Sequence, residues 1–551
     1  MSILPTDESA LRVLATMPFL DRLELAAVSG LSEGTAHNAL ERLHGEGLVH
    51  CVRHAGRHTA STRRWYVIAG GLALLARLDE TPADRLLRTH PVSAHWQRLL
   101  LERLDGAAVI YRLASGVASV EGALRFRWYR GAALDAAGML QDGRTLGVIR
   151  QGATADRTAF FERFRRLLDP REAVPRALLA LLPDEARLRQ YRRLLARYPG
   201  PVFLARERDV ANAVSGDPVW HLTSATVVLS LEEVLERLRP GGSLPSEPPL
   251  ARKSPPRDLS IPPEPKNIRD HLLPIVLKHS HKAMLDRLAD WPFITPGDLR
   301  TLAGLSPSGL SQITTRLSGL GLAASFLLGG RPRMALTRRG LAYLARRDRV
   351  SVVEAVRRWS VESTDGKDLK TWRDVPGTHS RSLARTIEHT DAVHGFLGRM
   401  SRQARERSYQ VVQFDPPHRA SRRFRHRGRL RSIHPDAFGL LRRGSETFPF
   451  FLEWERRAVR PSTMAARLAP YLRYYSSKQP LDDHGEWPLA LVVFGDELAE
   501  SNFHGVARRE MDRAEVDVPL WVSHTSILEK VGPLGKAWRE PDVLEPACPF
   551  L

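Results

Sequence analysis

The chain has few cysteines and no long apolar run, and these shortages exclude several classes of protein. Cys51 and Cys548 are the only cysteines in 551 residues, too few for a disulfide framework or a cysteine-based zinc site. The N-terminus lacks the basic-then-apolar pattern of a secretion signal. The longest apolar stretches, such as Leu489–Phe494, are much shorter than a membrane span. We therefore expect a cytoplasmic protein with no membrane partner.

Acidic residues are scarce relative to basic ones. The chain has 82 Lys and Arg against 62 Asp and Glu, which gives a net charge of +20 and a pI near 10.5. Nearly all of the excess is arginine, whose planar guanidinium binds phosphate through two parallel hydrogen bonds. A nucleic acid is therefore the favoured partner. The alternative is an arginine-rich composition that reflects a GC-rich genome.

The sequence contains an internal repeat. A proline-rich segment, residues 239–268, is expected to be a linker between two halves. Pro18-Phe19 matches Pro292-Phe293 and Gly30-Leu31-Ser32 matches Gly304-Leu305-Ser306, both 274 residues apart (292 − 18). Later matches pair His90 and His95 with His389 and His394, and pair Asp135 and Trp220 with Asp436 and Trp521. These matches predict a tandem duplication of a two-domain unit.

The first domain of each copy has the pattern of a winged helix-turn-helix. In the second copy we expect helices over Met284–Trp291, Thr295–Ala303 and Ser306–Gly319, followed by a hairpin with its tip at Gly329–Arg333. Leu310, Ile313 and Leu317 share one face of the third helix. Ser308, Ser311, Gln312 and Thr315 then face outward, where they can contact bases, and Arg331 and Arg333 of the hairpin can contact phosphate.

The first copy follows the same plan. Its expected DNA contacts are Thr35, His37, Asn38 and Arg42 on the third helix, and Arg53, Arg57, Arg63 and Arg64 on a basic hairpin that also carries His54 and His58. Winged helices also serve as protein-interaction modules, which is the alternative interpretation.

The second domain of each copy has the pattern of an α/β domain. In the second copy we expect strands over Ser408–Phe414, Ala437–Leu441, Phe448–Glu455, Leu489–Phe494 and Leu520–His524, and a helix over Thr463–Tyr475. Residues i and i+2 of a strand project to one side, so Glu453 and Glu455 share a face, and the neighbouring strand brings Asp436 beside them. These three acids are candidate ligands for Mg²⁺ or Mn²⁺ and candidate catalytic residues. The alternative is a surface strand with solvated acids.

These motifs resemble a known family. The winged helix, the helix with His389 and His394, Pro435-Asp436, and the strand with Glu453 before Tyr471 and Tyr474 look like the replication-relaxation family of bacterial plasmid and mobile-element proteins. The resemblance covers roughly residues 280–530, and the first half through the internal repeat. It implies a restriction-endonuclease-like PD-(D/E)xK fold in the second domain.

The resemblance places Asp436 and Glu453 on the two metal-binding acids, whereas Glu455 stands at the usual lysine position. Lys478 or Arg457 could supply the missing positive charge. In the first copy Asp135 is kept, but the alignment puts Arg150 and Gly152 opposite Glu453 and Glu455, which predicts an inactive domain. The histidines of the repeat have i, i+5 spacing, unsuited to a shared metal on one helix face, and are expected to be structural.

The predicted fold class is a multidomain α+β or α/β protein with two winged helix-turn-helix domains, each followed by a restriction-endonuclease-like α/β domain. The predicted domains are 8–82 and 269–350 (winged helices), 88–238 and 385–540 (α/β domains, the first degenerate), and 239–268 (linker). The expected function is that of a replication-relaxation DNA-binding protein acting on plasmid, mobile-element or chromosomal DNA, with metal-dependent nuclease activity left open. The alternatives are a non-catalytic transcription or replication regulator and a protein-interaction scaffold. The expected partners are double-stranded DNA and proteins of replication, mobilisation or transposition.

Overall fold

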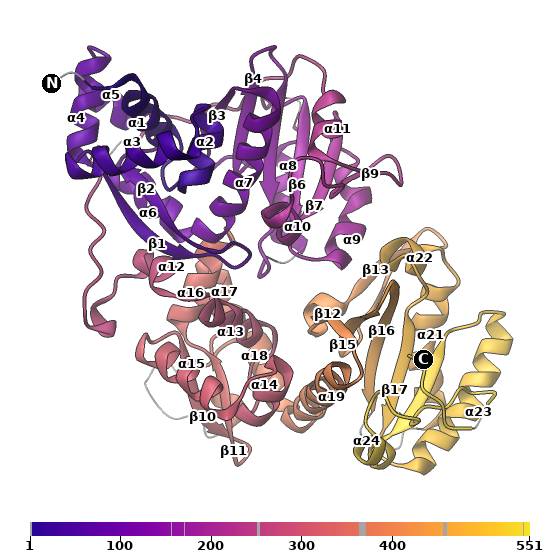
Figure 1. Cartoon of the computed structure of the whole chain (residues 1–551). Coiled ribbons are helices and arrows are strands. Elements are labelled where there is room, and N and C mark those ends of the chain that lie inside the picture. Colours follow the sequence, from indigo (N-terminus) through magenta and orange to yellow (C-terminus); the bar gives the residue numbers. More distant parts are fainter. Residues whose placement is uncertain are drawn as a thin grey trace. The chain divides into compact units, whose positions relative to one another are not determined.

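The computed structural model describes residues 3–155, 157–169, 171–250, 254–362, 371–455, 460–543 and 545–550, which form a mixed α and β structure with several sheets (Figure 1). The chain divides into two compact units. Unit 1 comprises Met1–Asp286 and Arg339–Ala355, and unit 2 comprises Arg287–Arg338 and Val356–Leu551. Among the described residues, no helix has both the length and the apolar character needed to cross a membrane.

The chain begins with a module of helices and one hairpin. Its elements are α1 (Pro5–Thr16), α2 (Arg22–Ser29), α3 (Glu33–Gly45), β1 (Val49–Ala55), β2 (Ser61–Val67) and α4 (Ala69–Leu78). Asp21 and Glu24 form a capping box at the start of α2, and Gly30 ends that helix in the left-handed conformation. The Ser32 side chain then caps α3 by accepting a hydrogen bond from the Thr35 N–H. These two signals fix the sharp connection between α2 and α3.

A second module repeats this order of elements. It consists of α13 (His279–Asp290), α14 (Pro296–Ala303), α15 (Pro307–Gly319), β10 (Ala323–Leu328), β11 (Arg331–Leu336) and α16 (Arg338–Arg347). Thr295 caps α14, Gly304 ends it in the left-handed conformation, and Ser306 caps α15. The three helices predicted from the sequence are therefore present. The division into units runs through this module, because most of α13 and nearly all of α16 belong to unit 1.

The two modules also share an unusual backbone detail. Phe19 and Phe293, which the repeat aligns, both have positive φ, at 72° and 67°. The N–H of Phe19 donates to the carbonyl of Trp65, and the N–H of Phe293 donates to the carbonyl of Met334. A phenylalanine rarely adopts this conformation, so its presence at the same place in both modules agrees with a duplication.

Unit 1 also contains a seven-stranded sheet. Its strands, in spatial order, are β3 (Leu124–Trp128), β4 (Ala136–Leu140), β5 (Thr145–Arg150), β6 (Ala177–Leu182), β7 (Val202–Arg206), β8 (Trp220–Leu222) and β9 (Val228–Leu229). β3, β4 and β5 are antiparallel, whereas β5, β6 and β7 are parallel. Every residue of β6 is buried, as expected of a central strand with both faces covered. The helices are α5 (Ala83–Thr89), α6 (Ala94–Glu102), α7 (Leu104–Glu121), α8 (Arg157–Arg166), α9 (Glu185–Leu195), α10 (Glu207–Asn212) and α11 (Leu231–Glu236).

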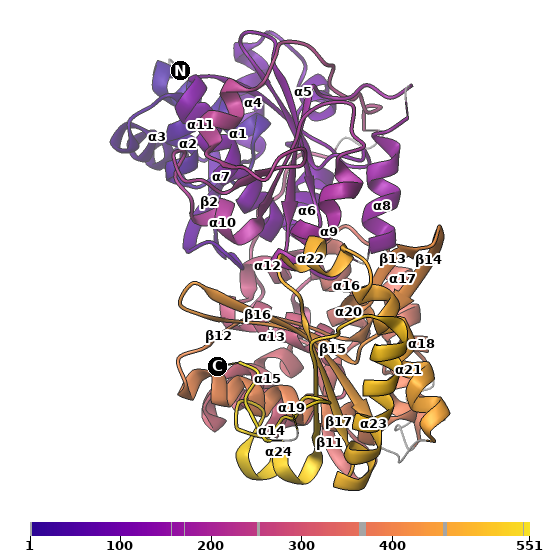
Figure 2. The ribbon, with the colours of Figure 1, turned by 90° about the vertical axis from the view of Figure 1, so that its right-hand side faces the viewer.

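Unit 2 contains a five-stranded sheet and a separate two-stranded ribbon (Figure 2). The sheet has the order β12 (Gln410–Asp415), β15 (Ala437–Arg443), β16 (Glu446–Glu455), β17 (Leu489–Phe494) and β18 (Leu520–His524). The ribbon consists of β13 (Arg422–His426) and β14 (Arg429–Ile433). The helices that follow the second module are α17 (Val352–Trp359), α18 (Thr378–Arg385), α19 (Ile387–Glu406), α20 (Pro417–Ala420), α21 (Pro461–Tyr475), α22 (Gln479–His484), α23 (Glu497–Ala514) and α24 (Thr525–Val531).

The two large sheets share a topology over five strands. β12, β15 and β16 are antiparallel and β16, β17 and β18 are parallel, which is the pattern of β3 to β7. This correspondence corrects two of the sequence matches. Trp220 lies on β8 and Trp521 on β18, which correspond to different positions in the sheet order. His90 and His95 lie at the end of α5 and on α6, whereas His389 and His394 lie on α19, the long helix directly before the sheet.

The proline-rich segment is bound to unit 1 along much of its length. The Glu247 carboxylate accepts hydrogen bonds from the backbone N–H groups of Arg130, Gly131 and Ala132. Further on, the Leu259 N–H donates to the Tyr66 hydroxyl. Short helical turns follow: η1 (Pro265–Asn267), η2 (Asp270–Leu272) and α12 (Leu273–Val276), while η3 (Trp372–Asp374) lies in unit 2. The described parts of the segment, residues 239–250 and 254–268, thus belong to unit 1 and form hydrogen bonds with it.

Candidate functional site

Asp436 lies directly before β15, beside the strand that carries the other two candidate acids. Its N–H donates to the carbonyl of Leu452, 2.9 Å away, and its Oδ2 accepts a hydrogen bond from the N–H of Trp454 at 2.8 Å. These bonds extend the antiparallel register of β15 and β16, in which Ala437 faces Leu452. The predicted adjacency of Asp436 to the strand of Glu453 and Glu455 is confirmed.

His389 is a partner of Asp436 that the sequence pattern did not reveal. Its Nε2 lies 2.9 Å from Asp436 Oδ1, and it reaches the acid from α19. The other carboxylate oxygen is held by the backbone, so the Asp436 side chain is fixed from two sides. The sequence interpretation considered His389 only as half of a metal pair with His394, whereas its partner is a carboxylate 47 positions later in the chain.

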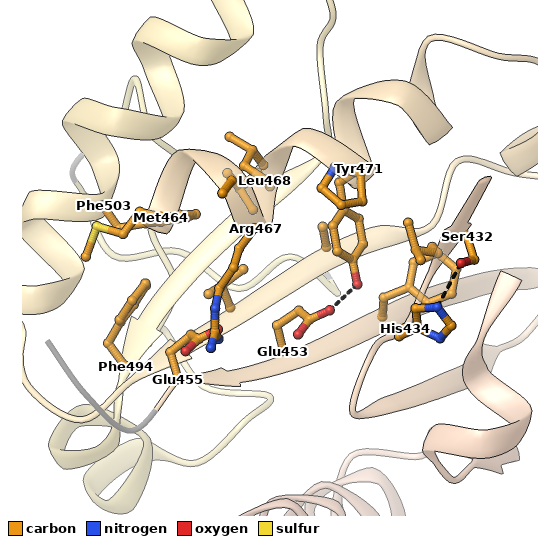
Figure 3. A pocket seen from close by; sticks show the side chains of 17 residues that line it. Ser432, His434, Glu453, Glu455, Met464, Arg467, Leu468, Tyr471, Phe494 and Phe503 are labelled. Carbon is orange, nitrogen blue, oxygen red and sulfur yellow. Dashed lines mark hydrogen bonds and ion pairs between the residues drawn. The ribbon is translucent and has the colours of Figure 1, made fainter. Parts of the chain in front are cut away.

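Glu453 holds its proton more tightly than an ordinary glutamate. Burial, followed by the nearby charge of Asp436, raises the pKa of Glu453 to about 8. The Tyr471 hydroxyl from α21 donates a hydrogen bond to Glu453 Oε1 at 2.5 Å and partly offsets this effect (Figure 3). Asp436 and Glu453 are therefore close enough for the charge on one to oppose ionisation of the other.

Glu455 forms an ion pair with Arg467 of α21 (Figure 3). Arg467 brings a positive charge beside Glu455, which stands where the resemblance implies a lysine, and it is a residue that the sequence interpretation missed. Of the two residues predicted to supply the missing positive charge, Lys478 is exposed at the N-cap of α22 and does not line the cavity next to Glu455. Arg457 lies outside the described residues.

The three acids face two different cavities. Glu453 and Glu455 line a cavity of about 410 Å³, whose other walls are largely apolar and include Met464, Leu468, Phe494 and Phe503. Asp436 lines a second cavity of about 400 Å³ that is rich in histidine: His379, His389, His394, His418 and His434. His434 borders both cavities.

The geometry of these acids bears on whether they can hold a metal ion. Within the described parts of the chain, no group of three or more His, Cys, Asp or Glu side chains is arranged to hold one ion. Glu455 forms an ion pair with Arg467, and the raised pKa of Glu453 favours its neutral form. The arrangement therefore does not fit a site formed by all three carboxylates, and binding of Mg²⁺ or Mn²⁺ stays a prediction.

The equivalent position in the seven-stranded sheet of unit 1 has different partners from those of Asp436. The Asp135 carboxylate accepts a hydrogen bond from the N–H of Arg150, just as Asp436 accepts one from Trp454. Arg150 therefore corresponds to Trp454, which shifts the sequence alignment by one residue. Ile149 and Gln151, instead of Arg150 and Gly152, stand opposite Glu453 and Glu455. The first copy still lacks both acids.

Asp135 is held by two arginines instead of a histidine. Arg163 and Arg349 lie 2.7 and 2.8 Å from its carboxylate. Burial alone would raise the pKa of Asp135. The two guanidinium groups outweigh this effect and hold the pKa of Asp135 well below its usual range. Asp135 is thus a buried carboxylate that its two arginines hold in the ionised form at neutral pH.

The predicted DNA-contact face of α15 is exposed. Leu310, Ile313 and Leu317 are buried, whereas Ser308, Ser311, Gln312 and Thr315 are exposed on the opposite side. Arg331 at the hairpin tip is also exposed, with 69% of its side chain accessible. Arg333 is 1% exposed: it pairs with Asp391 and donates to the carbonyl of Phe293 at 3.2 Å. The prediction of Arg333 as a DNA contact is wrong, because its guanidinium is enclosed by the fold.

The first module has a smaller basic surface than its sequence indicates. His37, Asn38, Arg42, Arg53 and Arg63 are exposed, and Thr35 is half-buried. Arg42 pairs with Asp7, and Arg57 is largely buried against Asp286, 3.1 Å away. Arg64 is fully buried in an ion pair with Glu24, so its prediction as a DNA contact is wrong. His54 is buried as well, 2.9 Å from Asp105.

Comparison with known proteins gives no match: no family model, no curated protein and no solved structure is significantly similar to the chain. The resemblance to the replication-relaxation family therefore stays a prediction from the sequence motifs.

Proposed function

We propose that this protein is a cytoplasmic DNA-binding protein that contacts duplex DNA through two winged helix-turn-helix modules. In this proposal α3 and α15 are the recognition helices, and the hairpins β1–β2 and β10–β11 are the wings. The observation that carries it is the exposed face of α15. The side chains of Ser311, Gln312 and Thr315 are exposed there, and no described residue forms a hydrogen bond with them.

The chemistry of this face suits base recognition. Hydroxyl and amide groups pair with base edges in the major groove, and glutamine forms two hydrogen bonds with adenine. The first module presents His37 and Asn38 in the same way, and asparagine has the same preference for adenine. Exposed arginines on the hairpins, Arg53, Arg63 and Arg331, would contact phosphate. Arg53 and Arg63 face each other across β1 and β2, and Arg63 also lies 3.4 Å from the carboxylate of Glu41.

We propose that the C-terminal α/β domain acts in a non-catalytic regulator of plasmid, mobile-element or chromosomal DNA. Each of its candidate acids already has a partner: His389 for Asp436, Tyr471 for Glu453 and Arg467 for Glu455. A cation shared by these carboxylates would have to displace the proton of Glu453 and separate Glu455 from Arg467. Both steps oppose metal binding.

One observation favours a second candidate, a metal-dependent nuclease. Asp436 raises the pKa of Glu453, and a divalent cation between two such carboxylates would relieve their repulsion. Cleavage of supercoiled plasmid with Mg²⁺ or Mn²⁺ by the wild type, lost in Asp436→Ala, would support the nuclease. A plasmid that stays intact, together with an unchanged melting temperature on addition of either cation, would support the regulator.

DNA binding is tested by equilibrium titration of the full chain against a fluorescent duplex. We expect affinity to fall steeply as salt rises from about 50 to 200 mM, because bound arginines release counterions from the phosphates. A variant with Ser311→Ala, Gln312→Ala and Thr315→Ala should lose preference for a selected site. The matched control is Ser501→Ala with Asn502→Ala on α23, two exposed polar residues outside the modules. Absent or salt-insensitive binding by the wild type would overturn the proposal.

A further inference from the structure

The β13–β14 ribbon is the most basic segment of unit 2. Residues 421–433 contain six arginines and no acid. His426 pairs with Arg429, so only Arg427 and Gly428 form the loop, and both have positive φ, at 47° and 75°. This is the geometry of a type I′ turn, which matches the twist of the two strands and gives a tight, defined hairpin.

Most of the ribbon's arginines are unpaired and exposed. The five exposed ones are Arg423, Arg425, Arg427, Arg429 and Arg431. None of them forms an ion pair or a side-chain hydrogen bond with any described residue, whereas arginines elsewhere, such as Arg64 and Arg333, are bound to carboxylates. Five like charges on one narrow ribbon repel one another, and nothing in the described fold offsets that cost. Such an arrangement suits an external polyanion.

The base of the ribbon is anchored to the domain. Arg422 is buried, lies 4.7 Å above the centre of the Phe438 ring, and donates to the carbonyl of Ala420. Phe424 is also buried and packs edge-on against Tyr474 of α21, with ring centres 5.2 Å apart. Arg422 and Phe424 therefore fix the base of the ribbon to the domain, while the other five arginines stay exposed.

We propose that the β13–β14 ribbon is a second DNA-binding element, which lies in the major groove of duplex DNA and contacts the flanking phosphates through its exposed arginines. A two-stranded ribbon fits the width of the major groove of B-form DNA, whereas the deep, narrow major groove of A-form RNA does not admit side chains. The inference rests on the proposed DNA-binding function and adds a contact outside the two helix–hairpin modules.

The test compares DNA binding by two variants of the full chain. One loses positive charges on the ribbon, and the other loses positive charges elsewhere on unit 2. The ribbon variant carries Arg423→Gln, Arg425→Gln and Arg429→Gln, which keep side-chain length and avoid the turn. The matched control carries Arg402→Gln, Arg508→Gln and Arg513→Gln, three exposed arginines on α19 and α23 that each lie near an acid. A third variant replaces the ribbon arginines by lysine. Equal melting temperatures establish that all three are folded.

We expect the ribbon variant to bind a random-sequence duplex at least tenfold more weakly than the wild type at about 150 mM salt. The slope of log affinity against log salt should fall by about 2.7, roughly 0.9 for each lost phosphate contact. The lysine variant should keep the slope, and the control should lose much less affinity. An RNA duplex should compete poorly.

Three outcomes would overturn the inference. These are wild-type affinity in the ribbon variant, an equal loss in the control, and equal competition by duplex RNA. Failure of the proposed function is distinguishable from these, because then the wild type itself would not bind duplex DNA. If the α15 variant loses site preference while the ribbon variant binds normally, only the ribbon inference fails.

Discussion

The guanidinium of Arg64 donates a hydrogen bond to the main-chain carbonyl of Phe19, 3.0 Å away, and Phe19 holds a left-handed backbone conformation. Arg333 and Phe293 repeat this relationship in the second module, at 3.2 Å. Each arginine also pairs with a carboxylate, Glu24 in one module and Asp391 in the other. Both modules thus combine a residue in the left-handed backbone conformation with a cation that binds its carbonyl.

This relationship predicts that Arg64 and Arg333 stabilise the fold. Arg64→Met should lower the free energy of unfolding by about 3–5 kcal/mol, because it leaves the buried Glu24 without its main cation. Arg333→Met should act in the same direction. The exposed neighbours Arg63 and Arg331 are the controls, and their replacement by Met should change stability by less than about 0.5 kcal/mol. Denaturant titration measures all four, and equal values for Arg63→Met and Arg64→Met would contradict the structural role.

The equivalent acids of the two sheets should differ in what they contribute to stability. Asp135→Ala leaves Arg163 and Arg349 without their shared carboxylate, so we expect a loss of about 3–5 kcal/mol. Asp436→Ala removes a half-buried acid whose partners are a histidine and a backbone N–H, and should cost only about 1–2 kcal/mol. Denaturant titration of the two variants side by side measures the difference. A larger loss for Asp436→Ala would contradict the stabilising role of Asp135.

The lowered pKa of Asp135 also makes the stability of the fold depend on pH in the acid range. Its pKa in the folded protein is lowered, so its stabilisation is complete above the ordinary aspartate pKa near 4 and is lost as pH falls below that value. The free energy of unfolding of the wild type should therefore fall more steeply below about pH 4 than that of Asp135→Asn. Parallel curves for the two proteins would show that the two arginines do not act on Asp135 in this way.

The raised pKa of Glu453 gives the stability of the fold the opposite dependence on pH. Its folded pKa is raised to about 8, so between the ordinary glutamate pKa and pH 8 the folded state holds a proton that the unfolded state releases. The group therefore destabilises the fold progressively as pH rises through this range. Glu453→Gln mimics the protonated acid and can still accept the hydrogen bond from Tyr471.

We expect Glu453→Gln to stabilise the protein at pH 8 by about 1–3 kcal/mol and to have little effect near pH 4. Thermal unfolding at several pH values checks this. Glu453→Ala serves as the comparison, because it removes the charge but also loses the Tyr471 bond and the packing. A stabilisation that is independent of pH would contradict a raised pKa.

Gln312 and Arg331, the two DNA contacts of the second module considered next, should contribute differently to binding: Gln312 to sequence preference and Arg331 to overall affinity. Gln312→Ala should reduce discrimination between a selected site and a site changed at one base pair by about 1–3 kcal/mol, because it removes a base contact. Arg331→Gln should weaken binding to all sequences alike and lower the salt slope by about 1, as expected of a phosphate contact. Competition titrations with matched and changed duplexes separate the two effects. Loss of discrimination in Arg331→Gln alone would reverse the assignment.

Local patterns predicted the elements of the fold well. The caps and the apolar spacing predicted both ends of α15 to within one residue. The apolar runs Leu489–Phe494 and Leu520–His524 form β17 and β18 with the predicted bounds. The ribbon β13–β14 was missed, because alternating arginines do not have the apolar pattern that marks a strand. The burial of Arg64 and Arg333 was also missed, since it depends on carbonyl and carboxylate partners distant in the sequence.

The candidate site was predictable only in part. The spacing of Glu453 and Glu455 and the position of Asp436 followed from strand geometry. The partners of these acids, His389, Tyr471 and Arg467, come from helices whose contacts no spacing rule gives. The same limit produced the one-residue error in the first copy, where only the hydrogen bond from Arg150 to Asp135 fixes the register.

The composition of unit 1 has a consequence for the order in which the protein can fold. The carboxylate of Asp348 binds Arg150 and the N–H of Thr154, and Arg349 binds Asp135, so residues of the second repeat complete the sheet of the first. A ribosome synthesises the N-terminal sheet long before it reaches these residues. During synthesis the N-terminal half can therefore form only part of these ion pairs, Arg150 with Glu207 and Asp135 with Arg163, and the rest become possible only after the chain has grown past Arg349.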